Sequence, residues 1–337
     1  MRLSNTLIAI ILACCTMPAV AKGVSNSDRT KATQGSIDCL LDDAWTCLNA
    51  GNCKKAIEDC NNAIRINPKD ASVYCMRATG YSITHQWQKA SDDCNKALLL
   101  DPSSADAYNS RAQLYGHMRQ YDKAIADCGK AMALDPESSQ AYAIRAQCYI
   151  FTHQYKKALE DCNKAISLDA TISQTYGVRA QVHGMLHEYG LALADCNKEV
   201  SMNGATAQTY CVQALAYLNL QDCNKALEDC NQAISMDAGF AQPYGVRAQV
   251  YLKTGQNDQA LDDANKAISI DPGDPWAYAI RAKVHNAKGQ YQEALADCDK
   301  ALSIDPKIAE AEVEKAEAYK GLPTQMIKNL LKWPGSQ

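Results

Sequence analysis

One sequence motif occurs in eight copies at a fixed interval of 34 residues, and this period constrains the fold more than any other feature. The motif reads KAIEDCNNAIRINP in its first copy and EALADCDKALSIDP in its last. The interval predicts a stack of similar units, each packed on the next, in place of separate globular domains. Without any insertion or deletion, the units are residues 37–70, 71–104, 105–138, 139–172, 173–206, 207–240, 241–274 and 275–308.

Each unit contains two segments with helical periodicity. In the third unit, small and apolar residues lie three or four apart, first through Tyr108, Ala112 and Tyr115 and then through Ala124, Cys128 and Ala131. A short polar turn separates the two segments, and Asp-Pro or an equivalent pair follows the second, where it prevents the helix from continuing. The unit is therefore predicted to be a helical hairpin.

Alanine occupies two positions in all eight units, the eighth and the twentieth. A small residue on each of two antiparallel helices lets their axes approach to the short end of the ~8–10 Å range. We expect these residues to mark the helix crossing inside each hairpin. They are Ala44, Ala78, Ala112, Ala146, Ala180, Ala214, Ala248 and Ala282 at the eighth position, and Ala56, Ala90, Ala124, Ala158, Ala192, Ala226, Ala260 and Ala294 at the twentieth.

The pattern resembles the tetratricopeptide repeat (TPR) family over residues 37–308. Tyrosine fills the fourth position of units two to eight, and proline occupies position 32 of five units. The sequence departs from the family at position 24, where it usually has cysteine in place of a large apolar residue. The resemblance implies an all-α fold, a right-handed α-solenoid superhelix of stacked hairpins whose first helices line a concave groove.

The resemblance also implies that positions 2, 5, 9, 12 and 13 of the first helices form the inner surface of that groove. Glutamine recurs in two of these columns, and its amide can both donate to and accept from the backbone of an extended peptide. Position 5 is small, which predicts room for a bound chain. The candidate peptide-binding residues are Gln113, Gln140, Gln147, Gln174, Gln181, Gln208, Gln242 and Gln249.

These features favour a non-enzymatic scaffold that binds a peptide or protein segment. The sequence has no G-x-S-x-G motif, phosphate-binding glycine loop, C-x-x-C or H-E-x-x-H, so neither an enzyme nor a metal or other cofactor is expected. With 34 Lys and Arg against 38 Asp and Glu, the chain lacks the basic excess that nucleic-acid binding requires. The expected partner is a protein or peptide.

Cysteine is unusually abundant, with 16 residues, and suggests a second hypothesis. The column at position 24 is interpreted as buried small apolar residues, because equivalent positions of stacked hairpins lie too far apart for disulfides. Cys47 and Cys53 face each other across one hairpin turn and are the best disulfide candidate. The alternative function is an exported thiol-rich redox or metal-buffering protein.

The ends of the chain give further expectations. Residues 1–21 resemble a secretory signal peptide, with Arg2, a short apolar run and the cleavage site Ala19-Val20-Ala21. The mature protein is therefore expected to be exported, periplasmic or secreted, without a membrane span; a lipid anchor on Cys14 is the alternative. Residues 22–36 are interpreted as a flexible linker, and residues 309–337 as a capping helix followed by a short tail helix.

Charged residues also follow the period. Arginine at position 7 and aspartate at position 23 recur beside core positions, which predicts a ladder of ion pairs between packed helices. Gln213 interrupts the arginine column and is expected to leave Asp229 without its partner. Glu199 replaces the small residue at position 27, and we expect it to loosen the junction between the fifth and sixth units.

Overall fold

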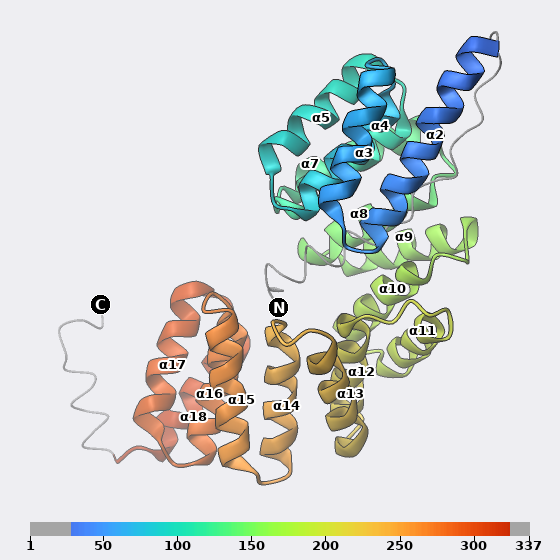
Figure 1. The fold of residues 1–337 in the computed structure, drawn as a ribbon. Coiled ribbons are helices and arrows are strands. Elements are labelled where there is room, and N and C mark those ends of the chain that lie inside the picture. Colours follow the sequence, from blue (N-terminus) through green and yellow to red (C-terminus); the bar gives the residue numbers. More distant parts are fainter. Residues whose placement is uncertain (1–27, 324–337) are drawn as a thin grey trace. The chain divides into compact units, whose positions relative to one another are not determined.

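The computed structural model describes residues 28–323, with side chains from Gly35 onward, and the described part is helical throughout, without a strand. The predicted signal peptide, Cys14 and the tail helix lie outside these residues. Helices alternate between the first and second members of hairpins (Figure 1). The first helices are α2 (Asp28–Asn49), α4 (Ala71–Ile83), α6 (Ala105–His117), α8 (Ser139–Phe151), α10 (Ser173–Met185), α12 (Ala207–Asn219), α14 (Ala241–Lys253), α16 (Pro275–Ala287) and α18 (Ala309–Gly321).

The second helices begin 16 residues after the start of the unit. They are α3 (Cys53–Ile66), α5 (Trp87–Leu100), α7 (Tyr121–Leu134), α9 (Tyr155–Leu168), α11 (Tyr189–Ser201), α13 (Cys223–Met236), α15 (Asn257–Ile270) and α17 (Tyr291–Ile304). The predicted helical hairpins are thus confirmed, and both alanine columns are buried. Among residues 28–323, no helix has the length and apolar content that crossing a bilayer requires.

The linker prediction is wrong for residues 28–36, because α2 begins at Asp28. This stretch is polar, but it contains no proline, and polarity alone does not prevent a helix from extending beyond its packed part. The first helix of the first hairpin is consequently longer than the others.

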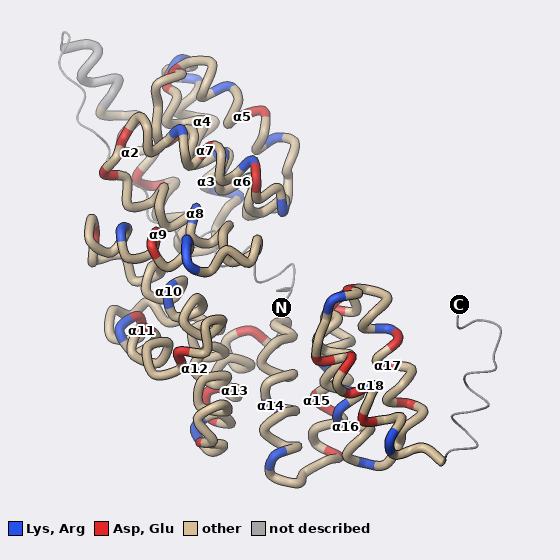
Figure 2. The backbone as a smooth tube through the Cα atoms, turned by 180° about the vertical axis from the view of Figure 1, so that it is seen from behind, with Lys and Arg blue, Asp and Glu red and all other residues tan. Residues whose placement is uncertain are grey.

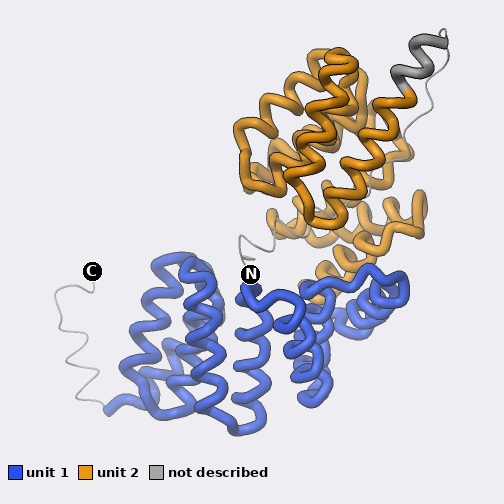
Figure 3. The backbone as a smooth tube through the Cα atoms, viewed as in Figure 1, with its two compact units in different colours: residues 1–7, 187–337 blue, residues 8–186 orange. Residues whose placement is uncertain are grey.

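The chain divides into two compact units at Leu186 and His187 (Figure 3). The division falls in the fifth repeat, between α10 and α11. Each unit is a stack of packed helices, and the division separates the two helices of the fifth repeat. Within each unit, basic and acidic residues are interspersed along the helices (Figure 2).

The turn inside every hairpin has the same backbone conformation. Its central residue, at position 15, lies in the left-handed region with φ between 58° and 76°. This conformation is cheap for glycine but costs other residues about 1–2 kcal/mol, so the surrounding turn must impose it. The eight residues are Gly51, His85, Arg119, His153, His187, Gln221, Gly255 and Gly289.

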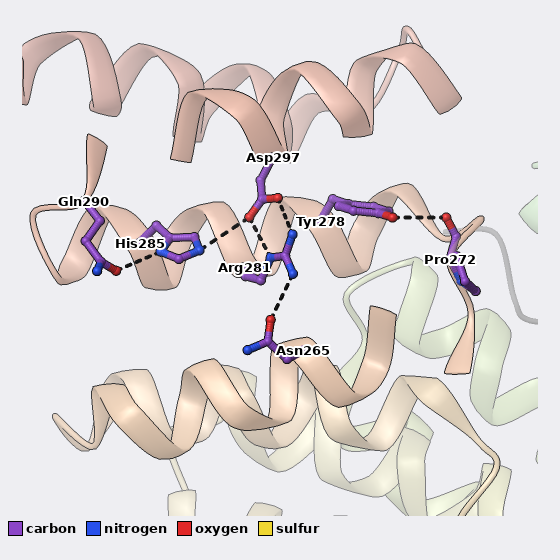
Figure 4. A network of polar contacts seen from close by, with 7 residues as sticks. All are labelled: Asn265, Pro272, Tyr278, Arg281, His285, Gln290 and Asp297. Atoms are coloured by element: carbon purple, nitrogen blue, oxygen red, sulfur yellow. Dashed lines mark hydrogen bonds and ion pairs between the residues drawn. The ribbon is translucent and has the colours of Figure 1, made fainter. Parts of the chain in front are cut away.

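The predicted ladder of ion pairs is present in five repeats. In each, the arginine Nε and Nη2 contact both carboxylate oxygens of the aspartate, as at Arg111 and Asp127, at 2.7 and 3.0 Å. Tyrosines at positions 4 and 11 flank the guanidinium, which explains why tyrosine recurs. Figure 4 shows the Arg281 pair, where Nη1 also donates to Asn265 of the preceding repeat. The pairs are Arg77–Asp93, Arg111–Asp127, Arg145–Asp161, Arg247–Asp263 and Arg281–Asp297.

The interruption of the ladder at Gln213 is also confirmed. Gln213 Nε2 donates to Asn197 Oδ1 at 2.9 Å, but it does not replace the bond to the aspartate. Asp229 Oδ2 is buried without a hydrogen-bond partner. Burial raises the pKa of Asp229 to about 6, and the nearby Glu228 adds to the effect. An aspartate at position 23 can therefore stay ionised at low cost only when the arginine at position 7 is present as its partner.

The junction between the fifth and sixth repeats is more specific than expected from sequence. Glu199 is 3% exposed, and its Oε2 accepts a hydrogen bond from Thr209 Oγ1 at 2.8 Å. Thr209 in turn forms a capping box with Thr206 at the start of α12. The carboxyl group thus has a defined polar partner across the α11–α12 contact, and the expectation of a loose junction is not supported.

Candidate functional site

A hollow of about 280 Å³ lies on the first helices of the last repeats, between α14, α16 and α18. All three helices belong to the unit that begins at His187. The apolar side chains of Trp276, Ala279, Ile280 and Val313 form part of its lining, together with Ala309. The polar part consists of Gln249, Lys283, Glu310 and Glu314.

The repeat register explains why these residues meet. Gln249 is at position 9 of the seventh repeat, and Trp276 is at position 2 of the eighth. Positions 5, 6 and 9 of the eighth repeat and 1, 2, 5 and 6 of α18 complete the lining. The hollow therefore lies on the first-helix face, and Gln249 is the one predicted glutamine that lines it.

Sequence reasoning missed most of this lining. Trp276 and Lys283 occupy positions 2 and 9 of the eighth repeat, which hold glutamine in earlier repeats. This change of residue type was the one sequence feature that could have indicated the hollow. Val313 is an apolar side chain that is 65% exposed. It was not predicted as a lining residue, because the charged sequence around it in α18 was interpreted only as a polar cap.

The charged residues of the hollow differ in their hydrogen bonding and exposure. Glu314 is held by Asn286, whose Nδ2 donates to the Glu314 carbonyl at 2.9 Å and to Oε2 at 3.0 Å. Lys283 and Glu310 are exposed. The hollow thus combines apolar surface with a hydrogen-bonded carboxylate and two solvent-exposed charges of opposite sign, which suits a protein segment with an apolar anchor.

Comparison with protein families decides the assignment. Models described as tetratricopeptide repeat match residues 79–149, 139–172, 207–240, 241–274 and 275–308. The chain belongs to the tetratricopeptide repeat family. Two parts of the repeat array lie outside the matched ranges: residues 37–78, and residues 173–206, the fifth repeat with its unusual Glu199.

Solved TPR-like structures agree with the fold. A chain of the Cut9–Hcn1 hetero-tetramer of the APC/C is 17% identical with a TM-score of 0.73, covering 86% of this chain and 57% of that one. Yeast Tom70 is 16% identical (TM-score 0.52; 98% and 71% covered). PilF of Pseudomonas aeruginosa is 18% identical (TM-score 0.52; 65% and 99% covered). This chain thus spans little more than half of the Cut9–Hcn1 chain. No curated protein matches the sequence.

The eight predicted TPR glutamines differ in accessibility. Gln113, Gln147, Gln181 and Gln208 are buried and offer little surface to a bound chain. The half-buried members of the set are Gln140, Gln174, Gln242 and Gln249. The glutamine columns therefore remain a predicted binding surface, of which the half-buried residues are the accessible part.

A small residue at position 5 does not everywhere leave room for a ligand. At Gly245, the Trp276 ring fills that space: a Cβ atom would lie 2.4 Å from the ring atom Cζ3. Real Cβ atoms do not approach so closely, and the ring cannot move without disturbing the hollow. Gly245 is thus needed for the tryptophan to lie across the first-helix face.

Gly245→Ala is expected to lower the free energy of unfolding by about 1–3 kcal/mol, because the added methyl group overpacks against Trp276. Gly129→Ala is the matched control: it lies within α7 with nothing within 4 Å of the added atom. It should stabilise the protein by about 0.5–1 kcal/mol. Urea unfolding followed by circular dichroism measures both; equal effects would contradict the close approach.

The cysteines lie mainly in the core. Cys47 is half-buried and Cys53 is buried, and the structure draws no bond between them; their disulfide stays a prediction. All seven cysteines of the position-24 column are buried, and burial raises the pKa of Cys60 to about 12. No cluster of three or more His, Cys, Asp or Glu residues suited to a metal occurs in the part of the chain that the structure describes.

Thiol labelling should therefore separate two classes of cysteine. Iodoacetamide should modify Cys39, which is exposed, at least about tenfold faster than Cys94 or Cys128, because a buried neutral thiol is a poor nucleophile. Mass spectrometry of peptides after timed quenching gives the rate at each residue. Rapid labelling of the position-24 column in folded protein would contradict its structural interpretation.

Proposed function

We propose that this protein is a non-enzymatic TPR scaffold that binds a protein segment on the face formed by its first helices. The observation that supports the proposal best is the hollow between α14, α16 and α18, which lies on that face and includes Gln249. We further propose, from the sequence of residues 1–21, that the scaffold acts after export, in the periplasm or outside the cell.

The hollow suits an anchor side chain of a longer partner. Pockets for drug-sized molecules have volumes of about 300–1,000 Å³, and this one, at about 280 Å³, is at or below that range. Trp276 and Ile280, both largely buried, offer apolar contact in its lining, and binding energy at protein interfaces concentrates in such buried contacts. A peptide could insert one large apolar residue here while its backbone continues along the half-buried glutamines of the same unit.

The thiol-buffer alternative lacks a supporting observation. Eleven of the fourteen described cysteines are buried, and a buffer requires thiols that react or bind metal while the protein is folded. The scaffold function is therefore the one that the site supports.

Substitution of Lys283 tests the proposal, because it is exposed and lines the hollow. We expect Lys283→Glu to reduce capture of a crosslinked partner in the native compartment at least about tenfold, because it adds a third carboxylate beside Glu310 and Glu314 and reverses the charge that the partner meets. The buried Gln147 and Gln181 are unsuitable, since a charge there would also disturb folding.

Lys266→Glu is the matched control. Lys266 is also exposed and lies in the neighbouring helix α15, but it does not line the hollow. Thermal unfolding of both variants confirms that they are folded. If both variants capture the partner as the parent does, the binding site is elsewhere and the proposal fails.

A further inference from the structure

The hairpin turns of the first four repeats form a basic edge. All four hairpins belong to the unit that ends at Leu186, and consecutive first helices pack on one another, so their turns lie at the same end of the stack. We call residues 50–55, 84–89, 118–123 and 152–157 the turn edge. Its charged residues are one aspartate, Asp122, and seven exposed basic residues, which are Lys54, Lys55, Lys89, Arg119, Lys123, Lys156 and Lys157.

This excess of positive charge is local. Along the second helices, acidic residues begin at position 22, about one helical turn beyond the turn edge, as at Glu58 and Asp92. The turns of repeats 5–8 have the opposite balance over the same positions. Their basic residues are Lys225 and Lys288, and their acidic residues are Glu188, Asp222, Asp258 and Glu293.

The acidic residues at the other end of these hairpins have a structural explanation. Asp101 Oδ1 accepts a hydrogen bond from the backbone N–H of Ser103 at 2.9 Å, and Asp169 Oδ1 accepts one from Thr171 at 2.8 Å. Asp135 does the same for Glu137 at 3.0 Å. These carboxylates stabilise the loops between repeats, whereas no comparable backbone role requires positive charge at the turn edge.

The turn edge also places its lysines where helix electrostatics disfavours them. The second helices begin there, and the N-terminus of a helix favours acidic residues and opposes cations. Helices α3, α5 and α9 nevertheless have lysine, and not an acidic residue, in their first turns. Helix stability therefore does not explain the residue types of this edge.

The tip of each turn departs from the residue that its backbone favours. Position 15 has a positive φ, which glycine adopts at the lowest cost, as Gly51 does in the first repeat. Repeats 2, 3 and 4 instead have His85, Arg119 and His153, each with φ 58° and each exposed. Departures from local preference are expected where a side chain serves a function.

The lysines at position 19 have the same placement in successive repeats. Lys89 Nζ donates to Gln86 Oε1 at 2.8 Å and lies 5.4 Å from the centroid of the Tyr81 ring. Lys123 and Lys157 make the equivalent contacts in repeats 3 and 4. Side chains held in this way lose less conformational freedom when a ligand binds.

The row of cations has the length of a short extended peptide. Stacked repeats are about 10 Å apart, so four turns span about 30 Å. Ten extended residues span about 33 Å. A segment rich in aspartate and glutamate can therefore place carboxylates beside the cations of all four turns.

We propose that the turn edge of repeats 1–4 binds an extended acidic segment of a partner protein. A membrane surface fits this edge less well, because peripheral membrane binding combines basic charge with inserted apolar side chains. The large apolar side chains exposed in this unit lie elsewhere, at positions 29 and 30 of the second helices: Ile66, Leu99 and Leu134. The surface lies outside the unit that contains the hollow, so the proposal does not rest on the proposed function.

Fluorescence anisotropy of labelled decaglutamate with the full chain tests the proposal. We expect saturable binding that weakens at least about tenfold as NaCl rises from about 50 to about 500 mM, because salt screens exposed charges. Lys89→Gln/Lys123→Gln/Lys157→Gln should reduce the affinity at least about tenfold. Tetraglutamate spans only about 13 Å, reaches two turns and should also bind at least about tenfold more weakly.

The matched control is Lys96→Gln/Lys130→Gln/Lys164→Gln. It removes the same charge from three exposed lysines of the same helices, α5, α7 and α9, about 10 Å further along each axis. We expect this variant to bind decaglutamate within about threefold of the parent. Thermal unfolding of both triple variants shows that they are folded.

The remaining outcomes overturn the proposal. They are absence of decaglutamate binding, an equal loss in the two triple variants, and binding to phosphatidylserine vesicles but not to decaglutamate. Equal losses would mean that net charge and not the turn edge attracts the peptide. Lys283→Glu lies in the other unit and should bind decaglutamate within about threefold of the parent, so this proposal and the proposed function fail separately.

Discussion

Arg111→Leu is expected to lower the free energy of unfolding by about 3–5 kcal/mol, because it leaves the Asp127 carboxylate buried without its counter-charge. The side chain of Asp127 is 5% exposed, and both its oxygens are bonded to the guanidinium. Lys130, at 3.6 Å, is largely solvated and cannot replace this bidentate contact. Asp229 shows the consequence within the same protein, since its pKa rises to about 6 where the arginine is missing.

Urea unfolding measures this loss of unfolding free energy, and two further variants show whether the lost charge pair causes it. Arg65→Leu removes an exposed arginine whose Nη1 donates to the half-buried Asn62, and it should change stability by no more than about 0.5 kcal/mol. Arg111→Leu/Asp127→Leu removes both charges and should recover much of the loss. If the double variant were as unstable as the single one, packing rather than charge would account for the ladder.

Glu199→Gln is expected to remove a pH dependence of stability that the parent protein shows. Burial raises the pKa of Glu199 to about 7, although the Thr209 hydrogen bond lowers it in part, whereas the unfolded value is about 4.3. The folded protein therefore binds the proton more tightly. Its contribution is fully present below about pH 4 and is lost as the pH rises through about 7.

The size of this effect follows from the pKa difference. At about 1.4 kcal/mol per unit, the parent should be about 4 kcal/mol less stable at pH 8 than Glu199→Gln, and the two should converge near pH 4. Thermal unfolding between pH 4 and pH 8 makes the comparison. Glu160→Gln, at an exposed glutamate of α9, is the control and should parallel the parent. Parallel curves for Glu199→Gln would contradict a raised pKa.

The 34-residue period predicted most of the architecture, because the same helical hairpin, with the same packing contacts, is repeated in every unit. Helix starts recur 34 residues apart from α4 to α18, and the Arg–Asp pairs follow from placing charges beside core alanines. The left-handed turn was not predicted, because histidine, arginine and glutamine share position 15 with glycine, and side-chain identity does not reveal a conformation imposed by the surrounding turn.

The candidate site was predicted only in outline. The resemblance indicated the first-helix face, but the hollow depends on Trp276 lying over Gly245 and on α18 packing beside α16. Both are packing effects between repeats, and they occur at positions where the sequence departs from its own period. The glutamine columns were periodic and therefore conspicuous, yet half of their members are buried.

A photo-crosslinking amino acid at position 283, compared with one at position 266, tests the central claim most directly. Both sites are exposed and belong to the same unit, but only the first lines the hollow on the first-helix face. The account predicts an adduct with a second protein from position 283, mapped by mass spectrometry to a short segment of that protein, and none from position 266. Adducts only from position 266 would contradict a binding site on this face.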